Sequence, residues 1–235
     1  MKRLLPFIII IVVLGVVIGS VVYMTQTKSA SNENTNQSAG PAPKPSPTLG
    51  PFKPGVPGAE PAHTLGPANA PVKIEEFGDF ECPPCALFHP ILKQMHEEFG
   101  DKLHITFREN PLANHQHAIP AASAAEAAGM QGKFWEMHAL IFENQNSWKT
   151  QFDVRPIFEG YAKQIGIDVE RFKRDVLSDA VEQRIYLDGK RARSMGVNST
   201  PTVFLNGREV PFQSLPAETL RVLIDNELRA AGTQK

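Results

Sequence analysis

The chain has two cysteines, Cys82 and Cys85, and only two residues separate them. A disulfide between positions this close adds little stability, because the stabilisation grows with the length of chain that the bridge encloses. In the segment FGDFECPPCALFHP, Cys82 lies where a strand is expected to end and a helix to begin. We expect its sulfur to be exposed above the helix N-terminus, which favours the thiolate. Cys85, one turn deeper on the same face, could then resolve a mixed disulfide. The pair therefore indicates thiol-disulfide exchange.

The two intervening residues, Pro83 and Pro84, affect the chemistry of the pair. Each proline fixes φ, and this preorganises the turn between the cysteines. Each also lacks the N–H group that could donate a hydrogen bond to the Cys82 anion. We therefore expect a milder stabilisation of the thiolate than in a site with a donor-bearing residue at position 84.

A carboxylate is expected near the pair, because Glu76 lies six residues before Cys82 on the inward face of the preceding strand. An ionisable group is costly in such a place unless it has a task, and here it could exchange a proton with Cys85. The neighbouring Glu75 makes the alternation imperfect, so one of the two glutamates must be a surface residue. The spacing favours Glu76 as the buried one.

A metal site is the main alternative from another class of function. Cys82, Cys85 and His89 form a C-x-x-C-x-x-x-H cluster, to which His115 or His117 could add a fourth ligand. Such ligands suit zinc or copper(I). A structural zinc site usually takes a second ligand pair from elsewhere, however, and the sequence has no second CxxC.

Hydrophobic patterns and turn residues indicate which elements position these groups. Strands are expected before the cysteines and again after the first helix, and a long helical block precedes a short hairpin and a last helix. The expected order is strand 72–77, helix 86–99, strand 102–107, helical segments between 115 and 195, strand 202–205, strand 209–212 and a helix from Pro216. This order predicts an α/β, thioredoxin-like fold with a helical subdomain inserted at about 113–195.

The N-terminal part of the chain differs from the rest. Residues 4–24 carry no charge and follow Lys2 and Arg3, which predicts one transmembrane helix with the N-terminus in the cytoplasm. A cleaved signal peptide is the alternative, and both place the remaining chain outside the cytoplasm. Residues 25–62 are rich in Ser, Asn, Gln and Pro, which predicts a disordered tether before a folded domain at 63–235.

The remaining sequence excludes several kinds of partner and offers one more candidate motif. The net charge is -1 with acids and bases interspersed, so nothing indicates a nucleic-acid partner. The sequence contains no glycine-rich phosphate-binding loop and no other nucleotide-binding motif. Thr200 and Pro201 precede an apolar strand, and this makes their peptide bond a candidate for the cis form.

The chain resembles the DsbA-like branch of the thioredoxin superfamily, particularly its membrane-anchored bacterial members. The resemblance rests on four ordered segments: EEFGDFECPPCALFHP, FRENPL, AAEAAGMQGKFWEMHALIFENQ and GVNSTPTVFLNGR. It implies Cys82 as the nucleophile, Cys85 as the resolving thiol and Glu76 as the buried acid. It also implies a cis proline at Pro201. The residues implied to contact a client peptide are Thr200, Pro201, Pro83 and Pro84.

The function that follows from this resemblance is a protein-disulfide oxidoreductase on the periplasmic side of the inner membrane. We expect it to form disulfides in exported proteins, with protein clients, a membrane redox partner and no cofactor. The dipeptide Pro83-Pro84 differs from the Pro-His of the strongly oxidising prototype, so the direction of electron flow stays open. Reduction or isomerisation by the same pair is the second expectation, and metal binding is the third.

Overall fold

The computed structural model describes residues 47–232. The predicted membrane helix at 1–24 and the tether up to residue 46 lie outside the described residues, as do residues 233–235. Within 47–232, every helix is too short or too polar to cross a membrane. The expected anchor therefore stays a prediction.

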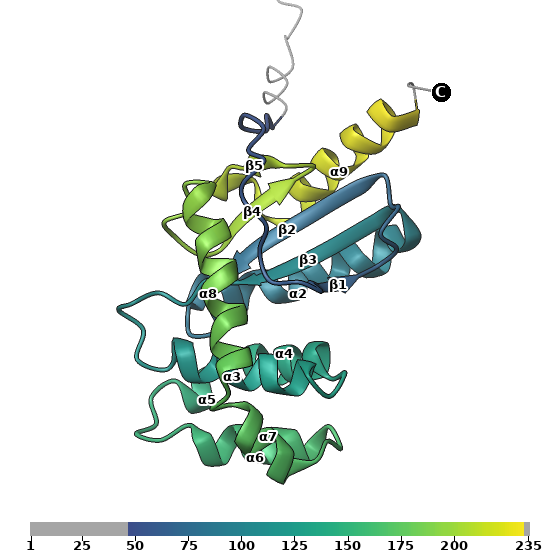
Figure 1. Ribbon diagram of the computed structural model, residues 1–235. Helices are drawn as coiled ribbons and strands as arrows, with labels where there is room; N and C mark the ends of the chain where they lie inside the picture. The colour runs from purple at the N-terminus through teal and green to yellow at the C-terminus, as the bar shows by residue number, and fades with distance from the viewer. Residues whose placement is uncertain (1–46, 233–235) are drawn as a thin grey trace, which may run out of the picture. The chain divides into compact units, whose positions relative to one another are not determined.

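A five-stranded sheet forms the centre of the domain, in the order β1-β3-β2-β4-β5 (Figure 1). The central strand β2 is parallel to β3 and antiparallel to β4, and β5 and β1 pair antiparallel at the two edges. The strands are β1 (His63–Leu65), β2 (Val72–Gly78), β3 (Leu103–Glu109), β4 (Thr202–Leu205) and β5 (Arg208–Val210). The carboxyl ends of β2 and β3 lie together, and the chain leaves β2 there to enter the cysteine motif.

Helices cover both faces of the sheet. On one face, α2 (Pro83–Phe99) and α9 (Ala217–Gly232) bury apolar residues of β2, β3 and β4 against Phe88, Leu92 and Leu220. On the other face, α8 (Asp179–Ser194) and the turn after it pack Ala192 and Met195 against the sheet. Burying such residues removes apolar surface from water and is the main force that holds the layers together.

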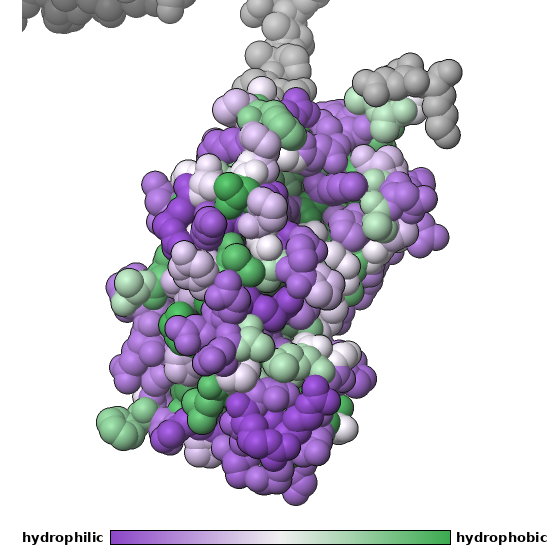
Figure 2. Space-filling model, in the orientation of Figure 1, coloured by the Kyte–Doolittle hydropathy of each residue, from purple (hydrophilic) through white to green (hydrophobic). Residues whose placement is uncertain are grey.

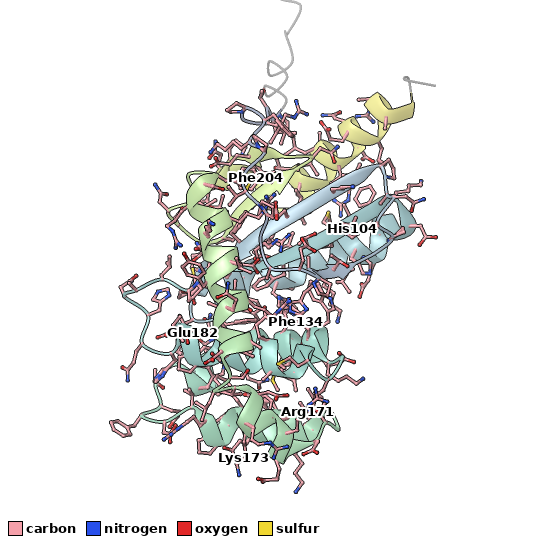
Figure 3. All side chains as sticks on the ribbon, in the orientation of Figure 1. His104, Phe134, Arg171, Lys173, Glu182 and Phe204 are labelled. Atoms are coloured by element: carbon pink, nitrogen blue, oxygen red, sulfur yellow. The ribbon has the colours of Figure 1, made fainter. Side chains whose placement is uncertain are left out.

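The inserted helical subdomain lies beyond the carboxyl ends of β2 and β3 (Figure 1). Its helices before α8 are α3 (Ala118–Gly129), α4 (Phe134–Glu143), α5 (Gln145–Trp148), α6 (Arg155–Gln164) and α7 (Val169–Asp175). Trp148 is fully buried at its centre, and the alanines of α3 let neighbouring helices approach closely. Arg171 and Lys173 lie at the end of the subdomain farthest from the sheet (Figure 3). Figure 2, drawn in the same orientation, shows that mostly hydrophilic residues cover this end of the subdomain.

The predicted fold class is confirmed for the described residues, and several element boundaries differ. The helix of the cysteine motif starts at Pro83 instead of 86, because the first helical positions need no N–H donor and tolerate proline. Strand β3 runs on to Glu109, and β5 ends at Val210 before a short 3-10 turn at Phe212–Ser214. The edge strand β1 was not expected, since three residues are too few for an alternating pattern.

The second half of the predicted tether is ordered, which corrects the expectation of disorder for residues 47–62. Gly50 N–H donates to Glu209 O at 2.8 Å, and Lys53 N–H donates to Gly207 O at 2.8 Å, so this N-terminal segment pairs with the outer edge of β5. Further on, Ala59 N–H donates to the buried carboxylate of Asp188 at 2.7 Å. These contacts come from backbone groups, which composition does not reveal.

Candidate active site

Cys82 and Cys85 lie at the junction of β2 and α2. Cys82 is the N-cap residue of α2, in extended conformation with φ -71° and ψ 119°, and both cysteines are free thiols. Cys85 is completely buried, and the side chain of Cys82 is also largely covered, with 5% exposed. The expected exposure of Cys82 is therefore wrong. The thiol of Cys82 instead lies against the loop before β4 and donates to Thr200 O at 3.3 Å.

The surroundings of Cys82 favour its thiolate. A hydrogen bond from the Cys85 thiol is the main cause that lowers the pKa of Cys82 from 9.0 to about 6, and the Thr200 side chain and the Cys85 backbone amide contribute further. Burial and the negative charge of Asp79 act in the opposite direction on this pKa. The Thr200 hydroxyl has no other hydrogen-bond partner among residues 47–232, so it is available to the sulfur.

Glu76 lies in the place expected for a buried acid. Its side chain is 1% exposed, and its Oε1 atom has no hydrogen-bond partner among the described residues. Burial, followed by the charge of Cys82, raises the pKa of Glu76 to about 8. Burial, the hydrogen bond to Cys82 and the charge of Glu76 raise the pKa of Cys85. The two buried acids, Glu76 and Cys85, are therefore close enough to influence each other's protonation.

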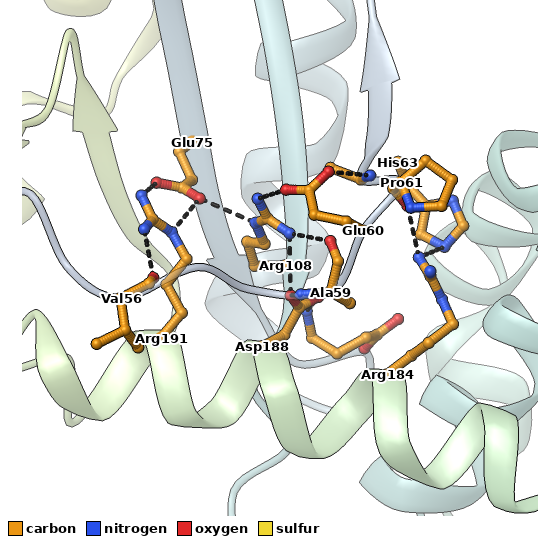
Figure 4. A network of polar contacts seen from close by, with 12 residues as sticks. Val56, Ala59, Glu60, Pro61, His63, Glu75, Arg108, Arg184, Asp188 and Arg191 are labelled. Carbon is orange, nitrogen blue, oxygen red and sulfur yellow. Dashed lines mark hydrogen bonds and ion pairs between the residues drawn. The ribbon is translucent and has the colours of Figure 1, made fainter.

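Glu75 is not a surface residue, contrary to the expectation that one of the two adjacent glutamates must be. It points to the opposite face of the sheet, where Arg191 binds both its oxygens at 2.7 Å and Arg108 donates to it at 2.9 Å (Figure 4). These hydrogen bonds and charges outweigh burial and lower the pKa of Glu75. Alternation along β2 thus sends one glutamate toward the cysteines and the other into an ion-pair network.

The loop before β4 completes the site. The peptide bond between Thr200 and Pro201 is cis, as its sequence context suggested. Beside it lies a hollow of about 230 Å³, whose lining residues come from the cysteine motif, the cis-proline loop and β5. These residues are Pro84, Ser199, Thr200, Pro201, Thr202, Glu209, Val210 and Phe212. The structure therefore brings together Cys82, Cys85, Thr200, Pro201 and Pro84, while Pro83 is exposed at the first position of α2.

Two buried residues near the cysteines were not found from the sequence. Asp79 occupies the loop between β2 and Cys82, and Gln145 on α5 donates from its amide to Phe80 O at 2.7 Å and to Cys82 O at 2.9 Å. Asp79 lies three residues before Cys82, and this short distance in the sequence could have identified it as a candidate site residue. Gln145 gave none, because its contact depends on how the inserted subdomain packs on the sheet.

The alternative of a metal site is not supported by the geometry. Among residues 47–232, no three His, Cys, Asp or Glu side chains are arranged to hold a metal ion. The ring of His89 packs against His138 and Phe142, with centroid distances of 5.2 Å and 5.5 Å. His117 is bound to the backbone carbonyl of Gln151 at 2.8 Å. The cluster predicted from Cys82, Cys85 and His89 does not form.

Comparisons with known proteins agree with this geometry. A thioredoxin family model matches residues 59–226. BdbD from Bacillus subtilis is 23% identical with a TM-score of 0.65, over 78% of this chain and 99% of that protein. The thiol-disulfide exchange protein α-DsbA2 from Wolbachia pipientis is 25% identical with a TM-score of 0.60, over 70% of this chain and 86% of that protein.

A curated relative contains a similar segment within a longer protein. The Na(+)/H(+) antiporter NhaA 1 of Salinispora arenicola is 39% identical over 148 residues, which are 62% of this chain and 22% of the antiporter. The chain thus spans about a quarter of the length of such relatives. The family match covers most of the chain, the resemblance to DsbA-like proteins is confirmed, and the chain belongs to the thioredoxin family.

Proposed function

We propose that this protein is a protein thiol-disulfide oxidoreductase in which Cys82 attacks and Cys85 resolves. The observation that carries the proposal is the hydrogen-bonded cysteine pair at the start of α2, with the pKa of Cys82 lowered to about 6 and that of Cys85 raised. At neutral pH such a pair holds one thiolate and one thiol. The solved thiol-disulfide exchange protein with the same fold supports this class of activity.

In the oxidising direction, a client thiolate attacks the sulfur of Cys82 in the Cys82–Cys85 disulfide, and Cys85 leaves as a thiolate. Glu76, with its pKa of about 8, can donate a proton to that thiolate. A second client thiolate then attacks the mixed disulfide, forms the client disulfide and releases Cys82 as a thiolate. Two electrons pass from the client to the pair, and a redox partner must remove them.

The client peptide is proposed to lie along the loop before β4. An extended peptide commonly binds by adding main-chain hydrogen bonds to an exposed backbone segment. The carbonyl of Thr200 faces Cys82, and the adjacent hollow is lined by Pro84, Pro201 and Phe212. A client cysteine held there would have its sulfur next to Cys82, while a neighbouring side chain would enter the hollow.

Oxidation of exported proteins is the favoured direction, because a stabilised Cys82 thiolate stabilises the reduced enzyme and makes its disulfide a stronger oxidant. Redox equilibration of the full chain with glutathione tests this. A reduction potential near -120 mV, as in strong oxidants, agrees with the proposal. One near that of thioredoxin, about -270 mV, would make the protein a reductant.

The proposed location is the inner membrane, with the catalytic domain on the periplasmic side and a membrane protein as redox partner. The basis is the uncharged segment 4–24 after Lys2 and Arg3. Carbonate extraction of membranes tests anchoring, and protease treatment of intact spheroplasts tests the side. Release of the chain by carbonate would contradict the proposed anchoring. Protection of the chain from protease would contradict the proposed periplasmic side. The antiporter activity named for the curated relatives is not carried over, since the match covers about a quarter of their length.

A further inference from the structure

Asp79 connects the cysteine motif to the inserted subdomain through its side chain. Its carboxylate is fully buried. The Oδ1 atom accepts a hydrogen bond from Glu81 N–H at 2.7 Å, and Oδ2 accepts one from Leu112 N–H at 2.8 Å. The Oδ2 atom also lies 2.7 Å from Nδ1 of His115. One side chain thus holds the loop before Cys82 and the segment that follows β3.

The backbone of Asp79 contacts both cysteines. Its carbonyl accepts a hydrogen bond from Cys82 N–H at 3.1 Å. Its amide lies at the Cys85 sulfur and slightly offsets the effects that raise the pKa of Cys85. A shift of this one residue would therefore move both sulfur atoms.

The charges around Cys82 give Asp79 a second effect. The main groups that favour the Cys82 thiolate are hydrogen-bond donors, namely Cys85 and Thr200. The carboxylates of Glu76 and Asp79 face the same region, and that of Glu81 is bound to His117 N–H at 2.5 Å. A negative charge near a thiol disfavours the thiolate, so Asp79 acts against the hydrogen bonds. His115 is the side chain in direct contact with the Asp79 carboxylate, with its Nδ1 atom 2.7 Å from Oδ2.

We propose that Asp79, paired with His115, is a positioning residue of the redox site whose charge limits how readily Cys82 ionises. This inference rests on the proposed exchange reaction at Cys82. It assigns two tasks to one carboxylate, which are holding the loop by hydrogen bonds and setting the electrostatic potential at the sulfur. The two tasks predict opposite changes in the pKa of Cys82 when the charge of Asp79 is removed. Loss of the negative charge lowers this pKa, whereas loosening of the loop raises it.

The decisive experiment is a thiolate titration of the reduced full chain, followed by absorbance at 240 nm. Asp79→Asn removes the charge and keeps one acceptor oxygen, and we expect the midpoint for Cys82 to fall by about half a unit to one unit. This corresponds to roughly three to ten times more thiolate at a pH below the midpoint. A purely structural role predicts the reverse, because a loosened loop weakens the hydrogen bonds that favour the thiolate.

A second substitution keeps the test decisive if Asp79→Asn does not fold. His115→Lys places a permanent cation beside the intact Asp79, and we expect the midpoint to fall here too. His115→Gln, which adds no charge, is its matched control and should not lower the midpoint. An unchanged or higher midpoint in both Asp79→Asn and His115→Lys would overturn the inference.

Two further variants separate this inference from the proposed function. Gln145→Leu removes the hydrogen bonds to Phe80 O and Cys82 O without changing charge, so it reports loop loosening alone and should not lower the midpoint. Cys82→Ser should abolish the titration that we assign to Cys82. Insulin disulfide reduction by the unaltered chain tests the exchange reaction itself. If that activity is absent while the midpoints move as expected, the proposed function fails and the electrostatic effect of Asp79 stands.

Discussion

The thiol of Cys82 donates a hydrogen bond to the backbone carbonyl of Thr200, although the two residues lie 118 positions apart in the chain. The contact places the reactive sulfur beside the cis peptide bond of Pro201 and above the hollow next to it. In the proposed reaction, a client peptide bound along this loop would replace the bond with one of its own. The same carbonyl would then accept a hydrogen bond from the protonated Cys82 thiol in the free enzyme and from the backbone of the bound client.

The two cysteines are expected to respond differently to replacement by serine. Cys85→Ser should accumulate mixed disulfides with clients, because the resolving thiol is missing. Cys82→Ser should form none and should lower insulin reduction by at least about a hundredfold, since the nucleophile is lost. Non-reducing electrophoresis with mass spectrometry distinguishes the two variants. If Cys82→Ser accumulated mixed disulfides instead, Cys85 would be the nucleophile and Cys82 the resolving thiol.

Glu76→Gln should make stability less dependent on pH. The pKa of Glu76 is about 8 in the folded protein, against an ordinary value of 4.5, so the folded state binds its proton more tightly than the unfolded state. The unaltered protein therefore loses stability as the pH rises from about 4.5 to 8, and Gln, which does not titrate, removes this loss. We expect the variant to gain on the order of a few kcal/mol relative to the unaltered protein at pH 8.

The same variant tests the proposed proton transfer. Without the carboxyl group, Cys85 loses the buried acid that is proposed to exchange a proton with it, and resolution should slow by about ten- to a hundredfold at neutral pH. Urea unfolding at pH 5 and pH 8 checks the stability, and stopped-flow mixing with a small disulfide checks the rate. Equal rates in Glu76→Gln and the unaltered chain would leave Glu76 without a catalytic role.

Replacement of Pro84 by His should make Cys82 more acidic. Proline occupies the first two helical positions, so the N–H groups of residues 83 and 84 are missing from the helix N-terminus. A histidine at position 84 restores one N–H donor and can add a positive charge, and both favour the thiolate. We therefore expect the pKa of Cys82, which is about 6 in the unaltered protein, to fall by about half a unit to one unit. Iodoacetamide alkylation between pH 4 and 8 measures it. An unchanged profile would show that the Cys85 thiol, not the helix start, sets the thiolate.

Arg191→Gln should destabilise the domain through the N-terminal segment. Arg191 binds both oxygens of Glu75 at 2.7 Å and donates to Val56 O at 2.7 Å, in half-buried surroundings (Figure 4). Loss of these bonds should cost about 1–3 kcal/mol of unfolding free energy, measured by urea unfolding. The matched control is Arg221→Gln, which removes a similar two-bond pair with Glu98 in a more exposed place. The control should change stability little. Equal losses in both variants would argue against a special role for Arg191.

The sequence predicted most of the fold and the centre of the site, because the signals were local. Cys82, Cys85 and Glu76 lie within ten consecutive residues before and at one helix start, and Pro201 directly precedes a strand. Asp79 and Gln145 were missed because their importance depends on contacts with Leu112, His115 and Phe80 across the fold. The covered position of Cys82 was missed for the same reason, since the covering loop is distant in sequence.

The hydrogen bonds that Gly50 and Lys53 form with β5 also determine what this side of the sheet can bind. A bare edge strand presents free amide and carbonyl groups that can recruit a strand from another molecule. Here the chain's own backbone occupies them. Proteolytic trimming beyond residue 53 would uncover β5 and leave its edge open to pairing with a strand of a second trimmed molecule.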